Sequence, residues 1–322
     1  MNCLVDIPTI DITPLAGEDE EAKALVARQI HCACRSSGFF YVSNHGIDIV
    51  TFHFIVNEFH RTITEEEKWD LAINAYNKSN SQTRSGYYMA KRGEKVVESF
   101  SFINPAFNEM HPKVKKKIPL YETNVWPKAS RYPEFRPFME RYFNNMFDLS
   151  ALILRGMALA LGQNENFFDA YYHKEDTLSS VRLIRYPCLK DYPPVKTAPD
   201  GTKLGFGDHL DVSLITLLFQ TPVPNLQVEI GDNIWYDVPV SDSNFLVNCG
   251  TYMAHITNNY FHAPNHRVQH INAERFSLPF FVNFSYESII KPFSPHGSNE
   301  AVPHGKFLID GFDALVVKNG QT

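Results

Sequence analysis

The sequence has no excess of basic residues and no apolar run long enough to cross a membrane. Its 322 residues carry 30 Lys and Arg against 36 Asp and Glu. This balance argues against nucleic acid or an anionic membrane as a partner, because binding phosphates requires an excess of cations. The most apolar segment, residues 149–162, contains Arg155 and is shorter than the roughly 20 residues that span a bilayer. Residues 1–15 lack the basic and apolar parts of a signal peptide, so we expect a cytoplasmic protein.

Cysteine is scarce, and the five cysteines are scattered. Only Cys32 and Cys34 lie close together, and no second pair completes a tetrahedral zinc site, so we expect free thiols. Internal repeats, low-complexity tracts and Gly/Ser linkers are missing as well, so no segment marks a domain boundary. The apolar content of 44% is enough for one large core. We therefore predict a single domain over residues 1–322.

Helical patterns dominate the first part of the chain. Residues 21–36 are predicted to form a helix between two short strands at 7–12 and 38–43. Thr64, followed by Glu67 three residues later, forms the pattern of a capping box, which predicts that another helix begins there. The longest helical pattern covers residues 135–161, where apolar residues recur every three or four positions and Gly162 suits the C-terminal end.

The pattern changes at about residue 178. Short runs of β-branched and aromatic residues, such as "SVRLIRYP", "VSLITLLFQ", "FLVNCG" and "FSLPFFVNF", alternate with Pro, Gly, Asn and Asp. Many short strands separated by turn residues are typical of an antiparallel sandwich or barrel. We therefore predict a helix-rich N-terminal part that packs around a β-rich C-terminal part.

A candidate metal site begins with His209 and Asp211 in "GDHLDVSLITLL". Side chains in a strand repeat every two residues, so this imidazole and this carboxylate face the same side and can share a metal. Such a pair alone is more often a surface turn before a strand. A second histidine would complete the set of two histidines and one carboxylate that non-haem Fe(II) oxygenases use, with three coordination positions left open.

Four later histidines could supply this ligand, and their spacing does not decide among them: His255, His262, His266 and His270. The last two would face the same way on one strand. After the predicted turn at "INAE", Arg275 and Ser277 lie two apart on the returning strand. An arginine fork beside a hydroxyl can bind a carboxylate through paired donors. The alternative is an arginine on an edge strand in water.

Longer stretches resemble a known superfamily. "DIPTIDITPL", "GFFYVSNHGI", "HLDVSLITLLFQ" and "NAERFSLPFF" are similar to the Fe(II) oxygenases whose usual members use 2-oxoglutarate. Within it, "TRSGYYM", "VESFSFINPAF", "DTLSSVRLIRYP", "NCGTYMAHITNNYF" and the terminal "NGQT" resemble the isopenicillin N synthase family. The resemblance covers almost the whole chain.

The resemblance implies a fold and a metal. The fold is a double-stranded β-helix, or jelly roll, at about 176–290, with flanking helices at about 1–175 and a C-terminal helix and tail at 291–322. It implies that Fe(II) is bound by two histidines and one aspartate, and in the substrate-free state also by a glutamine of the tail: His209, Asp211, His266 and Gln321. The remaining histidines have no ligand role.

The resemblance also implies a substrate, the tripeptide δ-(L-α-aminoadipoyl)-L-cysteinyl-D-valine. This substrate loses four hydrogens on closing two rings, so one O2 becomes two waters and no 2-oxoglutarate is expected. The residues implied to hold its valine carboxylate are Arg275, Ser277 and Tyr186. Arg84 is implied to pair with the aminoadipoyl carboxylate at the other end. Tyr88 and Ser180 are implied to be further substrate contacts, while Phe206 and Leu218 would form the apolar wall. We expect a monomer.

Some positions depart from the family pattern. Gly205 and Gly207 flank Phe206 where Ser and Glu are usual, which is expected to loosen the backbone beside the first ligand. Arg182 stands where relatives usually carry a small or apolar residue, and it would crowd the valine pocket if it faced the cavity. The segment between Phe293 and Phe307 is shorter than expected. Two other functions therefore remain open: a 2-oxoglutarate-dependent Fe(II) oxygenase, or an inactive jelly-roll binding protein.

Overall fold

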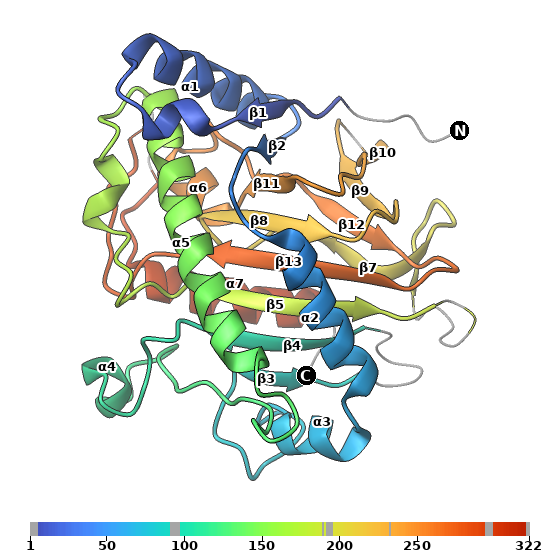
Figure 1. The fold of residues 1–322 in the computed structure, drawn as a ribbon. Coiled ribbons are helices and arrows are strands. Elements are labelled where there is room, and N and C mark those ends of the chain that lie inside the picture. The colour runs from blue at the N-terminus through green and yellow to red at the C-terminus, as the bar shows by residue number, and fades with distance from the viewer. Residues whose placement is uncertain are drawn as a thin grey trace.

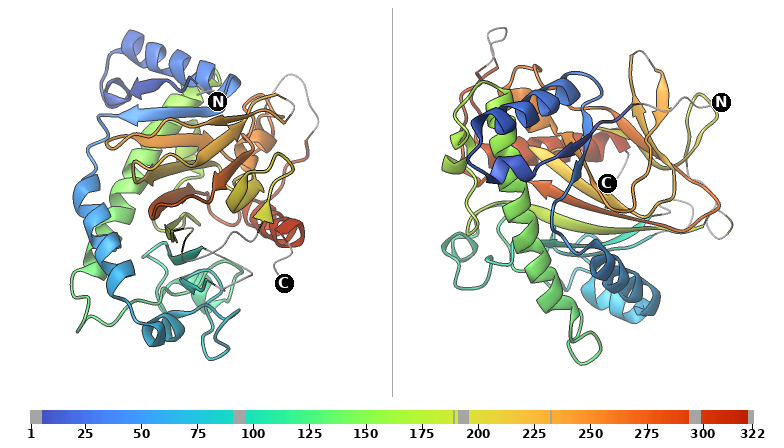
Figure 2. Two further views of the ribbon diagram at one scale, coloured as in Figure 1. Left: turned by 90° about the vertical axis from the view of Figure 1, so that its right-hand side faces the viewer. Right: turned by 45° about the horizontal axis from the view of Figure 1, so that its top comes forward.

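Two antiparallel β-sheets face each other and enclose a cavity, with helices packed outside (Figure 1). The computed structural model describes residues 6–90, 97–188, 190, 196–231, 233–293 and 299–319. Figure 2 shows the sheets from two further directions. This arrangement confirms the predicted jelly-roll core with flanking helices.

The larger sheet has eight strands in the described part of the chain. Their order across the sheet is β1, β2, β11, β8, β13, β5, β4, β3. All neighbours are antiparallel except β1 and β2. In that order the strands are β1 (Thr9–Asp11), β2 (Phe39–Ser43), β11 (Phe245–Cys249), β8 (Ile215–Gln220), β13 (Arg275–Val282), β5 (Ser180–Tyr186), β4 (Glu98–Ile103) and β3 (Gly86–Tyr88).

The smaller sheet supplies the opposite wall of the cavity. Its strands, in order, are β10 (Trp235–Asp237), β9 (Leu226–Glu229), β12 (His266–Gln269), β7 (Lys203–His209) and β6 (Lys196–Thr197). Strand β12 therefore pairs with β7 and β9, whereas the next strand, β13, pairs with β5 and β8 in the larger sheet. The predicted turn at "INAE" therefore carries the chain from one sheet to the other, and β13 does not pair with β12.

The main helices cover the outer face of the larger sheet, and α5 runs across it in Figure 1. Helix α5 buries apolar residues such as Phe143, Met146 and Ile153 at the predicted spacing. The α-helices are α1 (Glu20–Arg35), α2 (Ile49–Thr62), α3 (Glu65–Leu71), α4 (Pro112–Lys115), α5 (Phe135–Ala160), α6 (Thr251–Ile256) and α7 (His304–Asn319), with short 3-10 turns at Thr13–Ala16 and Phe167–Ala170. No helix in the described ranges has both the length and the apolarity needed to cross a membrane.

Several local predictions are confirmed. Helix α3 begins with the predicted capping box, in which Thr64 and Glu67 bind each other's backbone N–H groups. Gly162 follows α5 with a φ of +69°, a left-handed conformation that suits glycine. Helix α2 and the strands β3 and β4, which extend the larger sheet, were not predicted.

A buried ion-pair network fixes β4 and β5 to α3. Glu98 of β4 accepts hydrogen bonds from Lys68 at 2.9 Å and from Arg185 at 2.8 Å. Burial raises the pKa of the Glu98 carboxyl, but the hydrogen bonds and positive charge of Lys68, with a smaller effect from Arg185, outweigh burial and lower the pKa below its ordinary value of 4.5. The ionised carboxylate therefore stabilises the fold above about that pH, and the contribution is lost as the pH falls through the lowered pKa.

We predict that Glu98→Gln lowers the free energy of unfolding at pH 7 by about 1–3 kcal/mol, because the buried Lys68 and the partly buried Arg185 each lose a charged partner. The difference from the unsubstituted chain should shrink as the pH falls through the lowered pKa of Glu98, because the carboxyl then becomes neutral in the unsubstituted chain as well. Urea unfolding across this pH range measures both effects. Glu65→Gln is the matched control, because Glu65 also pairs with Lys68 but its side chain is 75% exposed, against 9% for Glu98. Equal losses for the two variants would contradict the role of burial.

Candidate functional site

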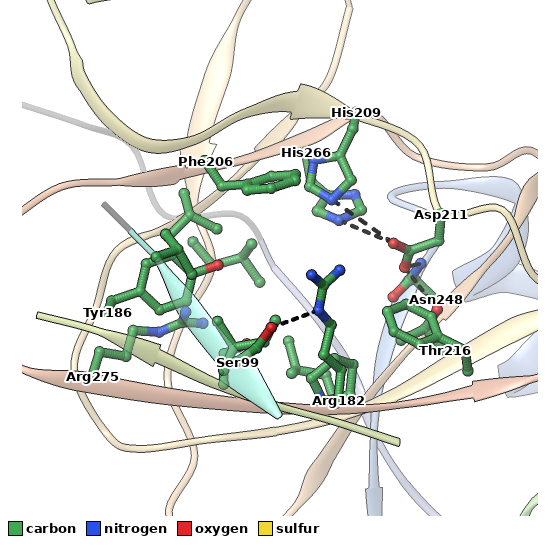
Figure 3. A pocket seen from close by; sticks show the side chains of 18 of the residues that line it. Ser99, Arg182, Tyr186, Phe206, His209, Asp211, Thr216, Asn248, His266 and Arg275 are labelled. Atoms are coloured by element: carbon green, nitrogen blue, oxygen red, sulfur yellow. Dashed lines mark hydrogen bonds and ion pairs between the residues drawn. The ribbon is translucent and has the colours of Figure 1, made fainter. Parts of the chain in front are cut away.

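Three side chains converge at one end of the cavity (Figure 3). His209 ends β7, His266 begins β12 directly opposite it, and Asp211 follows β7 in the turn that leads to β8. The Nε2 atoms of His209 and His266 lie 3.9 and 3.7 Å from Asp211 Oδ1. One nitrogen from each histidine and one carboxylate oxygen lie within 4.8 Å of one another. Of the four later histidines that the sequence left open, the structure brings only His266 to this group within the described residues.

Both histidines are held in the tautomer that a metal requires. His209 Nδ1 donates to Gly207 O at 2.9 Å, and His266 Nδ1 donates to Pro264 O at 3.1 Å. A carbonyl oxygen can only accept, so the proton is on Nδ1 in each ring. The lone pair of each Nε2 is therefore directed toward Asp211 and available to a metal.

The two carboxylate oxygens of Asp211 have different surroundings. Oδ2 accepts hydrogen bonds from Thr216 Oγ1 at 2.7 Å and Asn248 Nδ2 at 2.9 Å, which leaves Oδ1 facing the histidines. Burial raises the pKa of Asp211, but the electrostatic effects of the neighbouring His266 and His209 and the two hydrogen bonds outweigh burial and lower it. The carboxylate is thus ionised, as a metal ligand must be.

A β-bulge in β7 shapes this end of the cavity. Between β7 and β12 the register pairs His209 with His266 and Phe206 with Val268. The two residues between the paired positions of β7 therefore lie opposite a single residue of β12. Phe206 and His209 consequently both line the cavity, with ring centroids 4.6 Å apart, although side chains three apart in a regular strand face opposite ways.

Gly205 and Gly207 lie within β7, and neither has a positive φ. The expected loosening of the backbone by these glycines stays a prediction. A Cβ on Gly205 would lie 3.2 Å from the Tyr186 ring, so this glycine gives the tyrosine room to pack. Asp211 differs from the prediction, because it follows the strand rather than sharing it with His209.

The donor set fits Fe(II). Two neutral imidazoles and one carboxylate are the ligands of the facial triad in non-haem Fe(II) oxygenases, and they leave positions open for substrate and O2. The described residues also provide the supporting hydrogen bonds that such ligands need.

The opposite end of the cavity contains a buried arginine. Arg275 is fully buried, and its Nη2 donates to Gln220 Oε1. Its Nε and Nη1 have no hydrogen-bond partner in the described part of the chain. Burial lowers the pKa of Arg275, because desolvation disfavours the charged guanidinium, and the neighbouring Tyr186 opposes this shift only in part. Ser277 and Tyr186 line the same region, and Tyr186 is opposite Arg275 in the register of β5 and β13.

The side walls contain both expected and unexpected residues. Phe206 and Leu218 line the cavity, as the sequence analysis expected. Arg182 also faces the cavity, and its guanidinium lies between the triad and Arg275 in Figure 3. The cavity wall at Arg182 is therefore charged rather than apolar.

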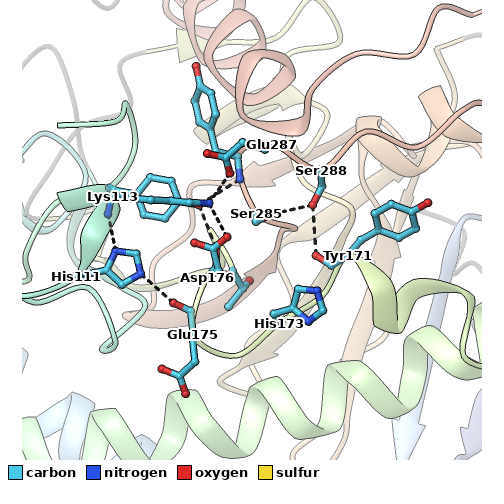
Figure 4. Close-up of polar contacts among 12 residues, drawn as sticks. His111, Lys113, Tyr171, His173, Glu175, Asp176, Ser285, Glu287 and Ser288 are labelled. Carbon is cyan, nitrogen blue, oxygen red and sulfur yellow. Dashed lines mark hydrogen bonds and ion pairs between the residues drawn. The ribbon is translucent and has the colours of Figure 1, made fainter. Parts of the chain in front are cut away.

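Three other predicted residues lie apart from the described lining of this cavity: Arg84, Tyr88 and Ser180. Arg84 donates to the backbone carbonyls of Leu120 at 2.9 Å and Leu178 at 3.1 Å. Lys113, close to Leu120 in the chain, donates hydrogen bonds to Asp176 at 2.6 Å and also to Glu287 (Figure 4). These bonds hold the segment that carries Leu120 in place. In this structure, Arg84 thus binds the backbone.

Two expectations fall on residues that the structure does not describe. Gln321 lies outside the described residues, as do residues 294–298 of the segment between Phe293 and Phe307. The proposed ligand role of Gln321 stays a prediction.

Sequence reasoning missed the residues that hold the ligands and the clamp, namely Thr216, Asn248 and Gln220. Each is a buried polar residue in an otherwise apolar strand, as in "ITLLFQ" and "FLVNC". A polar residue in such a strand signals a buried partner, but the sequence does not show which partner it meets.

Comparison with known proteins agrees with this geometry. Residues 178–284 match the model of the 2OG-Fe(II) oxygenase superfamily, and residues 7–129 match the model described as non-haem dioxygenase in morphine synthesis N-terminal. Among solved structures, a 2OG-Fe(II) oxygenase family protein from Caulobacter crescentus is 19% identical with a TM-score of 0.77, covering 98% of this chain and all of that one. A rice dioxygenase for auxin oxidation is 20% identical with a TM-score of 0.68, covering 98% and 96%. These structures establish the fold.

Curated relatives are much more similar. Isopenicillin N synthase from Streptomyces griseus is 57% identical over 321 residues, which are 98% of this chain and 97% of the relative. The enzyme of that name from Hapsidospora chrysogena is 49% identical over 332 residues, covering 99% and 98%. The matched lengths span nearly the whole of this chain and of each relative. The chain therefore belongs to the isopenicillin N synthase family.

Proposed function

We propose that His209, Asp211 and His266 bind Fe(II) and that Arg275, Ser277 and Tyr186 bind the carboxylate of a peptide substrate beside it. The observation that carries this assignment is the position of the triad in the same cavity as a buried arginine with unpartnered N–H groups. A metal centre at one end and a carboxylate clamp at the other fix the direction of an elongated substrate.

The activity is the oxidative bicyclisation of δ-(L-α-aminoadipoyl)-L-cysteinyl-D-valine to isopenicillin N, a step of β-lactam antibiotic biosynthesis. The tripeptide loses four hydrogens as the β-lactam and thiazolidine rings close. These hydrogens reduce one O2 to two H2O, so the reaction balances without an external reductant. Fe(II) bound by the triad supplies the electron-transfer chemistry through which O2 reacts.

The protein's own residues position the substrate. The guanidinium of Arg275 has a hydrogen bond to Gln220 on one side and free donors on the other, so its fork is oriented before substrate binds. Ser277 adds a hydroxyl on the same strand face. Phe206 and Leu218 provide apolar contacts that keep water from the reacting part of the substrate.

The far end of the tripeptide is proposed to reach Arg84, Tyr88 and Ser180. This requires Arg84 to exchange its hydrogen bonds with Leu120 and Leu178 for the aminoadipoyl carboxylate, or to accept the carboxylate in addition. A charge-assisted bond to a carboxylate is stronger than one to a backbone carbonyl, so such an exchange is favourable.

The remaining properties are proposed on the same basis. We infer that residues 1–322 act as one catalytic domain and that the protein is a cytoplasmic monomer, with the tripeptide as its small-molecule partner and with neither nucleic acid nor membrane as a partner. The net charge of −6 supports the last point.

A 2-oxoglutarate-dependent oxygenation is the second candidate, since Arg275 and Ser277 could also hold an oxoacid. We predict that Fe(II) and the tripeptide together support O2 uptake and that adding 2-oxoglutarate leaves the rate unchanged, because the substrate supplies all four electrons. An oxygen electrode measures the rate, and product analysis shows the ring closure. Uptake that depends strictly on 2-oxoglutarate would refute the proposed function in favour of this alternative.

We further predict that Asp211→Ala abolishes activity because its affinity for Fe(II) falls by more than about 100-fold. Thr216→Val changes only a residue that supports the ligand, and its affinity for Fe(II) should fall by roughly 10- to 100-fold. Anaerobic titration with Fe(II) measures both variants. Asp169→Ala, which removes a partly exposed carboxylate paired with Arg155, is the control and should bind Fe(II) normally.

Unchanged Fe(II) affinity in Asp211→Ala would exclude the ligand assignment. Failure of the unsubstituted chain to bind Fe(II) would instead favour an inactive jelly-roll binding protein. Thermal unfolding of each variant separates loss of the metal from loss of the fold.

A further inference from the structure

Arg182 places a second cation in the cavity, and the proposed function does not use it. It belongs to β5, four residues before Tyr186, and its side chain is half-buried. Figure 3 shows its guanidinium in the middle of the cavity, between the triad and the end that holds Arg275. Any substrate that spans these two ends passes this charge.

Neutral groups hold Arg182 in place. Its Nε donates to Ser99 Oγ at 2.9 Å, and Ser99 is itself buried on β4. The guanidinium carbon lies 4.3 Å from the centre of the Tyr88 ring, which is a cation–π contact. Both contacts fix the direction of the side chain without neutralising its charge, so the cation is oriented before any ligand arrives.

The cavity lacks a counter-charge for this arginine. Arg182 forms no ion pair with a carboxylate in the described part of the chain, whereas Arg185, on the other face of the same strand, pairs with both Glu98 and Glu274. Among the described residues that line the cavity, Asp211 is the only acid, and the triad and its supporting hydrogen bonds already engage it. Two guanidinium groups therefore face one cavity with no carboxylate available to either.

The guanidinium groups of Arg182 and Arg275 both influence the Tyr186 hydroxyl. Burial raises the pKa of the Tyr186 hydroxyl, and the charges of Arg275 and Arg182 each oppose that rise. Arg275 is opposite Tyr186 in the register of the two strands. An anion placed against the Tyr186 hydroxyl is thus attracted by both arginines.

We propose that Arg182 is a specificity-determining residue that binds the substrate's terminal carboxylate together with Arg275. This inference rests on the proposed function, because it takes the tripeptide as the ligand. It assigns to the cavity a carboxylate site with two cations, one fully buried and one beside the path to the metal. The cavity therefore selects for a peptide with a free C-terminal carboxylate more strongly than a single arginine would.

The test is to compare the tripeptide with its C-terminal carboxamide, using the Fe(II)-loaded protein without O2 so that binding is measured by calorimetry without turnover. Arg182→Met keeps a long side chain but removes the charge. It should weaken binding of the tripeptide by roughly 10-fold or more, the effect of losing one hydrogen bond to a charged group. Binding of the carboxamide should change much less, and Arg182→Lys should restore part of the affinity for the acid.

A second variant avoids dependence on Arg182 itself. Ser99→Ala keeps the charge of Arg182 but removes the hydroxyl that accepts the hydrogen bond from its Nε. This variant should weaken binding of the tripeptide several-fold more than binding of the carboxamide. With O2 present, Arg182→Met should raise KM more than it lowers kcat. Arg155→Met is the matched control, because Arg155 pairs with Asp169 away from the cavity, and it should bind both peptides as the unsubstituted chain does.

The outcomes separate this inference from the proposed function. If Arg182→Met weakens the binding of the tripeptide and of its carboxamide by the same factor, or weakens the binding of neither, Arg182 does not bind the carboxylate. The inference is then wrong while the proposed function stands. If the unsubstituted chain does not bind the tripeptide at all, the proposed function is wrong, and the inference falls with it.

Discussion

The carboxylate of Asp211 connects the two sheets. Its Oδ2 atom is bound by Thr216 of β8 and Asn248 of β11, which belong to the larger sheet, while its Oδ1 atom faces His209 and His266 of the smaller sheet. The distance between the sheets therefore sets the distance between the metal ligands. Helix α5 and the outer core hold the larger sheet rigid, so packing far from the site contributes to ligand geometry. The register between β7 and β12 places the two histidines opposite each other, and the bulge beside them adds Phe206 to the same wall.

The arginines of β5 show how strand geometry separates structural from functional charge. Arg182 and Arg185 are three residues apart, so they project from opposite faces of the sheet. Arg185 meets Glu98 and Glu274 on the outer face and is neutralised there, while Arg182 meets only Ser99 and Tyr88 on the inner face. The same residue type on the same strand thus stabilises the fold at one position and leaves a free charge in the cavity at the other.

Sequence reasoning reached the fold class and much of the site for clear physical reasons. Helix α5 was predictable because its buried residues follow the helical period, and the β-rich part because short apolar runs alternate with turn residues. It did not place β3 and β4. The residues of β4, "ESFSFI", do alternate between polar and apolar, which is a strand signal, but the helical patterns around it dominated the reading of this part of the chain. Strand β3 has only three residues, too few to show a period. Spacing could not choose His266 over His270, because only the pairing of β12 with β7 brings one of them to His209. The roles of Thr216 and Asn248 depend on contacts between strands that are distant in sequence, and the tail that carries Gln321 lies outside the described residues.

The buried charge of Arg275 links substrate binding to the stability of the site. Burying a guanidinium without a counter-ion is unfavourable, and the lowered pKa of Arg275 expresses that penalty. A neutral glutamine, Gln220, satisfies only one side of the group, so the rest of the penalty remains in the free protein. A carboxylate that binds Arg275 removes it, which means that part of the substrate's binding free energy comes from relieving a strain that the fold maintains. An uncharged analogue cannot do so. The unfavourable burial of Arg275 in the empty cavity thus makes the protein bind an acid more tightly than its neutral analogue. Arg182 is a second cation of this kind and lies nearer the metal ligands.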